Sequence, residues 1–328
     1  MLSYLLSRRK GLLSLFSPSR YTKTMSGLYK SCRLCPRNCG VNRIKGEIGF
    51  CGETAKLRIG AAVIHKGEEP PLVGSGGSGT VFISGCNLGC SFCQNYQISQ
   101  KDKISHNSLG REVSPQEFAG VCAALCDNGA ENINIVTGSH AVPGIIEGID
   151  AARKAGVRIP VLWNSSGYDS AVSLELLREY IDIYLPDLKT LDSKIADRFF
   201  NAPDYPEIAS AAILKMLKTK SKIIVRHLIL PGYLESTRSV LQWFAANAKN
   251  RALLSLMTQY TPVPGHKPMP NGYLTEDDYK TVLNWLDDFK IDDGFCQELV
   301  TGNDWLPDFR RTNPFSSELS LPVFNLRS

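Results

Sequence analysis

The chain has 328 residues, enough for one large α/β barrel or two ordinary domains. With 43% hydrophobic and 21% charged residues it has the composition of a globular protein, and no uncharged apolar run approaches the ~20 residues of a transmembrane helix. The net charge of +5 equals the contribution of Arg8, Arg9, Lys10, Arg20 and Lys23, so the remainder is near neutral and a broad nucleic-acid-binding face is excluded.

The first 26 residues form a separate basic segment. They are rich in Ser, Leu and Arg and contain no acidic residue, as is typical of mitochondrial presequences. We predict a targeting leader over residues 1–26 and a mitochondrial location. The alternative is a disordered basic tail on a cytoplasmic protein, and Met25 offers a second start of translation.

Residues 27–60 form a cysteine-rich segment. Cys32, Cys35, Cys39 and Cys51 follow the spacing C-x2-C-x3-C-x11-C. Four thiolates suffice for a structural zinc or for a second, closed iron–sulfur cluster, and spacing alone leaves both metals open. The ten cysteines of the chain are typical of a reducing compartment that uses thiolates as ligands rather than of a secreted disulfide scaffold.

Residues 61–310 alternate between strand and helix patterns. Apolar runs predict strands at 80–84, 133–137, 159–164, 182–188, 222–230 and 252–260. Helical patterns follow at 114–129, 143–156, 171–180, 190–219, 236–249 and 275–289, with Ser114 and Ser236 as N-caps and a break near Pro203 and Pro206. This order predicts parallel strands with crossover helices, so we expect an α/β fold, a partial (β/α)6 barrel, followed by an irregular tail at 311–328.

One motif inside this region is a decoy. GSGGSG (74–79) matches G-x-G-x-x-G, but a dinucleotide site needs a strand before the glycines and a helix after them. Here a strand follows directly. We therefore interpret these residues as a flexible loop that enters the first barrel strand.

Three cysteines lie directly after that strand in the sequence. Cys86, Cys90 and Cys93 have the spacing C-x3-C-x2-C, and parallel barrels gather their chemistry at the carboxyl ends of strands. Three thiolates can hold three corners of a 4Fe–4S cluster and leave the fourth iron open to a ligand. The alternatives are a zinc site that takes a fourth cysteine from elsewhere, and a non-enzymatic iron–sulfur or zinc protein acting as an electron carrier or scaffold.

Several sequence phrases follow one another along the chain: CRLCPRNCGVNR (32–43), EEPPLVGSGGSGTVFISGCNLGCSFCQNYQIS (68–99), NSSGYDS (164–170), DIYLPDLK (182–189), IVRHLILPG (224–232) and SLMTQYTPV (255–263). With the cysteine spacing and the aromatic Phe92, they resemble the radical SAM superfamily, in particular a pyruvate formate-lyase activating-enzyme-like branch with an N-terminal four-cysteine block. The resemblance implies an oxidoreductase whose 4Fe–4S cluster, held by the three cysteines, reductively cleaves S-adenosylmethionine (SAM) to a 5′-deoxyadenosyl radical for hydrogen abstraction.

The resemblance also implies partners. They are a glycyl radical protein as substrate and a reductant such as ferredoxin or flavodoxin, and we expect neither a nucleic-acid nor a membrane partner. Ordinary activating enzymes often lack the four-cysteine block, so this chain departs from them on that point.

The resemblance also implies which residues of this chain contact SAM, by their positions relative to the family's motifs. Phe92 is assigned to the cofactor site, and TGSH (137–140) replaces a GGE-like turn whose backbone receives the SAM amino group. Thr137 and Gly138 keep the backbone contacts, while the acidic side chain is absent. His140 is either a substrate contact or a structural histidine.

Further candidates end the later strands. Asn164, Ser165 and Ser166 could hydrogen-bond the ribose or the methionyl carboxylate, or cap the loop. Asp187 and Lys189 share one face of an extended segment and resemble a D-x-K pair beside SAM, with a barrel-mouth salt bridge as the alternative.

A charged pair interrupts the fifth barrel strand. Alternation sends Arg226 and His227 to opposite faces, and we expect Arg226 inside near SAM or substrate and His227 outside or in a structural hydrogen bond. Gln259 and Tyr260 could line the lower site, or Tyr260 could be a core aromatic. Cys122, Cys126 and Cys296 receive no role.

Overall fold

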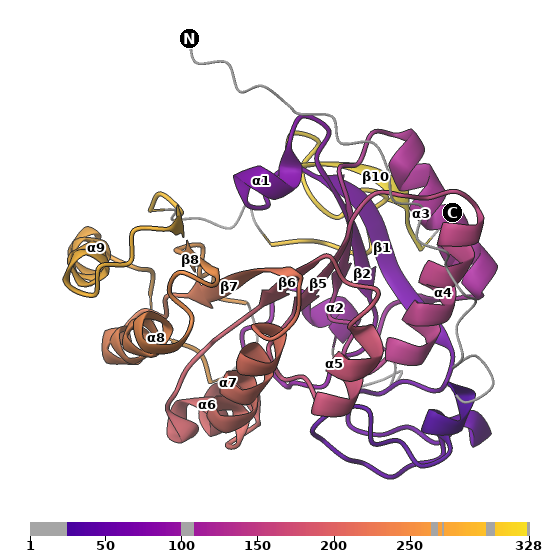
Figure 1. The fold of residues 1–328 in the computed structure, drawn as a ribbon, viewed down its shortest axis with the longest axis horizontal. Coiled ribbons are helices and arrows are strands. Elements are labelled where there is room, and N and C mark those ends of the chain that lie inside the picture. Colours follow the sequence, from indigo (N-terminus) through magenta and orange to yellow (C-terminus); the bar gives the residue numbers. More distant parts are fainter. Residues whose placement is uncertain (1–24, 100–107, 264–267, 271, 300–305, 327–328) are drawn as a thin grey trace.

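The computed structural model describes residues 25–99, 108–263, 268–270, 272–299 and 306–326 (Figure 1). The predicted leader lies outside these residues except for Met25 and Ser26. Met25 is only 3% exposed, so the packed core already includes it. In the described parts of the chain, no helix is long and apolar enough to cross a membrane.

A mostly parallel sheet forms the centre of the molecule. Its parallel strands pair in chain order: β2 (Ser78–Ile83), β4 (Ile133–Val136), β5 (Val161–Ser165), β6 (Ile183–Pro186), β7 (Lys222–Leu228), β8 (Leu253–Met257) and β9 (Gly294–Cys296). The α/β class and the six predicted strands are confirmed. The additional strand, β9, has only three residues, too few for a periodic pattern.

An antiparallel edge extends this sheet beyond the prediction. β1 (Leu57–His65) pairs with β2, with β3 (Arg111–Val113) and with β10 (Ser320–Phe324). β1 crosses the boundary predicted between residues 60 and 61 without a break, and β10 lies in the tail predicted to be irregular. Pro322 argues against a central strand, but β10 is an edge strand, where proline is tolerated.

The crossover helices lie in an arc outside the strands in Figure 1. They are α3 (Pro115–Asp127), α4 (Val142–Lys154), α5 (Ala171–Leu177), α6 (Ser193–Phe200), α7 (Tyr205–Met216), α8 (Leu234–Asn247) and α9 (Glu276–Asp288). Short helical turns are η1 (Ser26–Tyr29), η2 (Arg43–Lys45), α1 (Pro70–Val73) and α2 (Tyr96–Ser99).

Local signals explain most helix ends. Ser114 caps α3 in a reciprocal box with Glu117, as its sequence predicts. The break in the 190–219 helix separates α6 from α7, with Asn201 at φ +52° and Pro206 in the first turn of α7. Ser236 does not cap α8, which begins two residues earlier; its hydroxyl lies 2.7 Å from Thr190 Oγ1 instead.

The GSGGSG stretch is the loop that the sequence predicts. It follows α1 and enters β2. Glu131 Oε1 accepts the N–H groups of Ser75 (3.1 Å) and Gly76 (3.0 Å), so a carboxylate of the chain itself fills the anion position of this loop. A Cβ at Gly76 would lie 1.9 Å from Gly129 O, which explains the need for glycine there.

The strands bury side chains on both faces, as parallel strands do. One face packs against the helices in the main core, with Val81, Trp163 and Val225 among its members. On the other face, Leu162, Leu185 and Ile224 pack with Leu72 of α1. Because α1 directly precedes β2, Leu72 closes the barrel interior at the amino edge of the parallel strands.

Candidate functional site

The three-cysteine loop leaves the carboxyl end of β2 and leads into α2. Backbone hydrogen bonds anchor it to neighbouring elements: Gly85 N–H donates to Ile98 O (2.7 Å), and Ser91 N–H donates to Phe199 O (2.8 Å). Leu88 N–H points at Cys86 Sγ (3.3 Å). The loop is therefore held by the protein scaffold itself.

All three cysteines are half-buried. Burial is the largest cause that raises the pKa of Cys86, Cys90 and Cys93, and it takes the pKa of Cys90 to about 12. Lys189 opposes the rise at each of them. Such thiols stay neutral until a cation stabilises their thiolates, and iron provides that charge.

The geometry of the loop suits a cluster better than a single metal ion. Among the described residues, no three Cys, His, Asp or Glu side chains converge as ligands of one metal ion. In a 4Fe–4S cube each thiolate binds a different iron, so its sulfurs do not meet at one point. Three half-buried cysteines on one anchored loop, with the Lys189 ammonium beside them, fit such a group.

Phe92 supports the loop from below. Its ring packs edge-on against Phe199, Phe200 and Tyr260, at centroid distances of 6.0, 5.8 and 5.5 Å. Tyr260 is a core aromatic, 1% exposed, and its hydroxyl donates to Pro270 O (2.9 Å). Gln94 Nε2 donates to Gln259 O (3.2 Å), which ties the loop to the end of β8.

The TGSH turn follows β4 and is tightly packed. Thr137 adopts φ +65°, and its N–H donates to Asn164 O (2.9 Å). A Cβ at Gly138 would lie 2.6 Å from the Trp163 ring, so packing requires glycine there. His140 is 2% exposed, its Nε2 is bonded to Ser84 O (2.8 Å), and burial lowers its pKa to about 3. These contacts favour a structural histidine.

A buried aspartate organises the end of β5, and sequence reasoning missed it. Asp169 accepts bonds from Ser139 (2.6 Å), Ser165 (2.5 Å) and Trp163 (3.4 Å). Burial raises the pKa of Asp169, and these donors oppose the rise. Ser165 is thus committed to the loop, whereas the side chains of Asn164 and Ser166 carry no such bond to Asp169.

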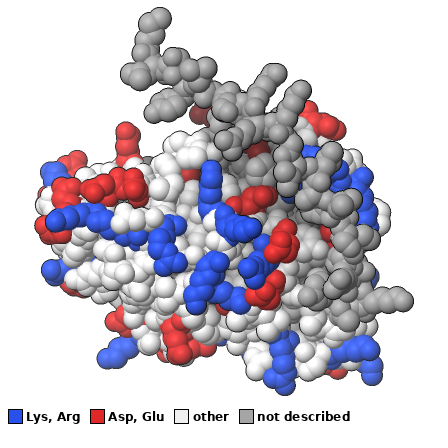
Figure 2. Space-filling model, in the orientation of Figure 1, with Lys and Arg blue, Asp and Glu red and all other residues white. Residues whose placement is uncertain are grey.

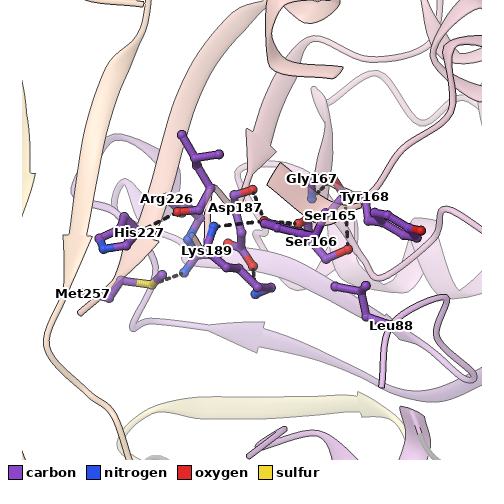
Figure 3. Close-up of polar contacts among 12 residues, drawn as sticks. Leu88, Ser165, Ser166, Gly167, Tyr168, Asp187, Lys189, Arg226, His227 and Met257 are labelled. Carbon is purple, nitrogen blue, oxygen red and sulfur yellow. Dashed lines mark hydrogen bonds and ion pairs between the residues drawn. The ribbon is translucent and has the colours of Figure 1, made fainter. Parts of the chain in front are cut away.

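Asp187 and Lys189 follow β6 and face one another, as their spacing predicts (Figure 3). Lys189 Nζ lies 2.5 Å from Asp187 Oδ2, and both side chains are about one-fifth exposed, at 22% and 19%. Tyr205, also missed from sequence, shares its hydroxyl between Ser166 O and Asp187 O, both at 2.8 Å. The same oxygen accepts Lys189 N–H (2.9 Å). Tyr205 therefore fixes the ends of β5 and β6 relative to each other.

Arg226 and His227 point to opposite faces of β7, as alternation predicts. Arg226 lies inside and ion-pairs with Glu68 (3.5 Å) and Glu69 (3.1 Å), and its Nη2 reaches Met257 Sδ (3.4 Å; Figure 3). His227 is bonded outside to Leu188 O (2.7 Å) and Thr237 Oγ1 (2.9 Å). The two glutamates belong to the phrase EEPPLVG, yet nothing local marked them as partners of Arg226.

The four N-terminal cysteines lie in one lobe. Burial, followed by the neighbouring Cys51, Cys32 and Cys39, raises the pKa of Cys35 to about 12, while Arg37 N–H opposes the rise. Arg37 Nε also donates to Asn87 O (2.8 Å), so the lobe touches the three-cysteine loop directly.

The outer surface is mixed in charge. On the face shown in Figure 2, Lys and Arg side chains are interspersed with Asp and Glu. A hollow of about 870 Å³ lies between the loops before α6 and α8 and the residue Asp278 of α9, away from the cysteines.

Several known proteins are similar to this chain in sequence or in fold. The Radical SAM superfamily profile matches residues 80–244. An uncharacterized protein of Methanocaldococcus jannaschii is 31% identical over 270 residues, which cover 81% of this chain and 77% of that protein. Streptococcus suis SuiB bound to S-adenosylmethionine superposes with a TM-score of 0.50 and 16% identity, over 65% of this chain and 48% of SuiB.

A domain of the pyruvate-formate lyase-activating enzyme from Bacteroides vulgatus is also similar, at a TM-score of 0.35 and 15% identity over 46% of this chain and 89% of that domain. The SuiB superposition shows the shared fold. The profile covers half of the chain, including the loop with the three cysteines.

Proposed function

Because this chain belongs to the radical SAM superfamily, which implies an enzyme with a 4Fe–4S cluster and SAM, we propose that Cys86, Cys90 and Cys93 hold that cluster. One observation carries the assignment: the three half-buried cysteines share one anchored loop at the carboxyl edge of the sheet, with Lys189 beside them. Reductive cleavage of SAM to a 5′-deoxyadenosyl radical that takes hydrogen from a substrate is the chemistry that the cluster supplies when bound.

The surrounding residues would bind and orient SAM. Lys189, held by Asp187, offers a point charge for the methionyl carboxylate. The backbone of Thr137 and Gly138 offers acceptors for the amino group, and Asn164 and Ser166 offer polar groups for the ribose. Phe92 packs the cysteine loop against Phe199, Phe200 and Tyr260 and so supports the cluster ligands from within the loop.

The substrate and the partners are proposals from resemblance. We propose a glycyl radical protein as substrate, a ferredoxin or flavodoxin as reductant, and a mitochondrial location. The N-terminal cysteines are proposed to bind zinc or a second cluster.

The test is SAM cleavage by the reconstituted protein. After anaerobic reconstitution and reduction with dithionite, wild type should form 5′-deoxyadenosine, and Cys90→Ala should reduce its formation to background because one iron loses its ligand. Cys126→Ala on α3 is the matched control and should retain cleavage. Full iron loading of wild type without cleavage, and without a SAM-dependent spectral change, would favour an electron carrier or scaffold instead. Cleavage by Cys90→Ala would mean that the ligands are misassigned.

A further inference from the structure

A second polar cluster lies inside the barrel. Glu68 and Glu69, from the loop between β1 and α1, are buried with side chains 9% and 5% exposed. They approach Arg226 from the amino side of the sheet. Asn134 of β4 is fully buried and donates its Nδ2 to Glu68 Oε1 (3.2 Å). Elements distant in sequence thus bring an amide and two carboxylates to one guanidinium.

Several buried polar atoms of this cluster lack a hydrogen-bond partner. Glu69 Oε2 and Asn134 Oδ1 are buried and accept no hydrogen bond, and Glu68 Oε2 has only its ion pair with Arg226 Nη1, at 3.5 Å. Arg226 Nε lies 3.1 Å from Glu69 Oε1 but is also without an aligned bond. Buried acceptors without a hydrogen-bond donor are rare in native proteins, so these oxygens need an explanation.

The charges of this cluster do not balance. Two carboxyl groups face one guanidinium, and the next cation, Lys189, is already held by Asp187. Burial raises the pKa of Glu68 to about 7, because the single guanidinium of Arg226 does not offset its loss of water. The cluster therefore lacks both positive charge and N–H donors. An ammonium or a guanidinium group supplies both at once, with three or five donors respectively.

The position of the cluster relates it to the cysteine loop. The backbones of Asp187 and Arg226 pair in an isolated parallel β-bridge between the ends of β6 and β7. Lys189 follows Asp187 by two residues. Leu72 of α1 packs with Leu162 and Leu185 in the interior, and α1 precedes β2 at the amino edge of the parallel strands. A ligand on Glu68 would therefore enter from the carboxyl edge, where the cysteines lie.

We propose that Glu68, Glu69 and Asn134 bind a protonated amine or guanidinium group of the substrate inside the barrel, below the cysteine loop. This inference rests on the proposed function, because the ligand is the substrate of that same site. Arg226 is a positioning residue that holds both carboxylates in place. The group comes either from a free small molecule or from a basic side chain of a peptide.

The experiment measures binding to the reconstituted, full-length protein. Agmatine is the probe for a free molecule, and a blocked Gly-Arg dipeptide is the probe for a side chain. Isothermal titration calorimetry in the presence of SAM should give a dissociation constant for at least one probe in the millimolar range or below. A blocked Gly-citrulline dipeptide, which has the same shape without the charge, should not bind.

Variants locate the binding. Glu68→Gln should weaken the binding probe about 10-fold or more, since it removes the charge but keeps the shape. Glu69→Gln is the second variant, in case Glu68→Gln fails to fold in a thermal melt. Glu175→Gln is the matched control, because this exposed carboxylate on α5 pairs only with surface groups, Lys215 and Arg178, and the control should bind as wild type does.

Each outcome decides the inference. Binding of agmatine indicates a small-molecule amine, and binding of the dipeptide alone indicates a peptide side chain. Absence of binding by both probes through the millimolar range, or equal binding by wild type and both Gln variants, overturns the proposal and leaves a structural ion cluster. SAM cleavage is measured in parallel: cleavage without probe binding sinks only this inference, whereas Glu68-dependent binding without cleavage sinks only the proposed function.

Discussion

Single buried polar side chains hold the carboxyl edge of the sheet in place. Asp169 gathers three donors, and the Tyr205 hydroxyl joins the ends of β5 and β6 through three backbone groups. His227 does the same between β7 and α8, through Leu188 O and Thr237. These residues contact no cysteine, yet they determine where the site residues stand.

The buried His227 should make the stability of the protein depend on pH. Burial lowers the pKa of His227 from 6.5 to about 4, so the folded protein prefers the neutral ring. Its contribution to stability is complete above pH 6.5 and is lost as the pH falls towards 4. The difference in unfolding free energy between wild type and His227→Gln should therefore shrink by up to about 3 kcal/mol over that range.

Denaturant unfolding at several pH values measures this difference. The other histidines titrate alike in both proteins, so their contributions cancel. A difference that stays constant from pH 7 to pH 4 would contradict the assigned burial of a neutral ring.

At the scale of elements, the site depends on close approach between the loops that follow the strands. Gly167, after β5, has φ +75°, and a Cβ there would lie 2.2 Å from Asp187 O after β6. That backbone oxygen also accepts the Tyr205 hydroxyl. A side chain at this position would separate the two loops that carry Ser166 and Asp187.

Gly167→Ala should therefore lower the unfolding free energy by about 2–4 kcal/mol, from left-handed strain together with the clash. It should also weaken SAM binding by the reconstituted protein. Gly120→Ala is the control: no atom lies within 4 Å of its Cβ in α3, and alanine should stabilise that helix by about 0.5–1 kcal/mol. Equal thermal melts for the two variants would contradict the close approach.

At the scale of the whole molecule, the last described strand, β10, forms one edge of the sheet. β10 covers the open edge of β1, and β1 in turn pairs with β2, which leads into the cysteine loop. Phe324 of β10 is 5% exposed, whereas Leu321 on the same strand is 50% exposed. The guanidinium of Arg111 stacks 4.4 Å from the Phe324 ring centroid.

Phe324→Ala should destabilise the protein by about 3 kcal/mol, because it removes a buried aromatic ring. Leu321→Ala should change stability by less than about 0.5 kcal/mol, since that side chain is exposed. Chemical denaturation of the two variants tests this. A Phe324→Ala protein as stable as wild type would mean that the tail is not part of the cooperative fold.

The sequence predicted the elements whose signals are local. The six long strands, the Ser114 cap and the break between α6 and α7 each depend on a pattern a few residues long. β10 was missed because its proline is tolerated only at an edge, and an edge is a property of the sheet. The cap at Ser236 was wrong because its hydroxyl found a tertiary partner, Thr190.

The sequence alone determined the superfamily and the cysteine loop, because ligand spacing and strand–helix alternation are written along the chain. The tertiary structure alone decided which buried groups meet: Glu68 with Arg226, Tyr205 with Asp187, and Phe324 with β1. Such contacts depend on the register and curvature of the sheet. No local pattern specifies that register. The polar cluster of Glu68, Glu69, Asn134 and Arg226 therefore follows only from the assembly of β1, β4 and β7 in one sheet.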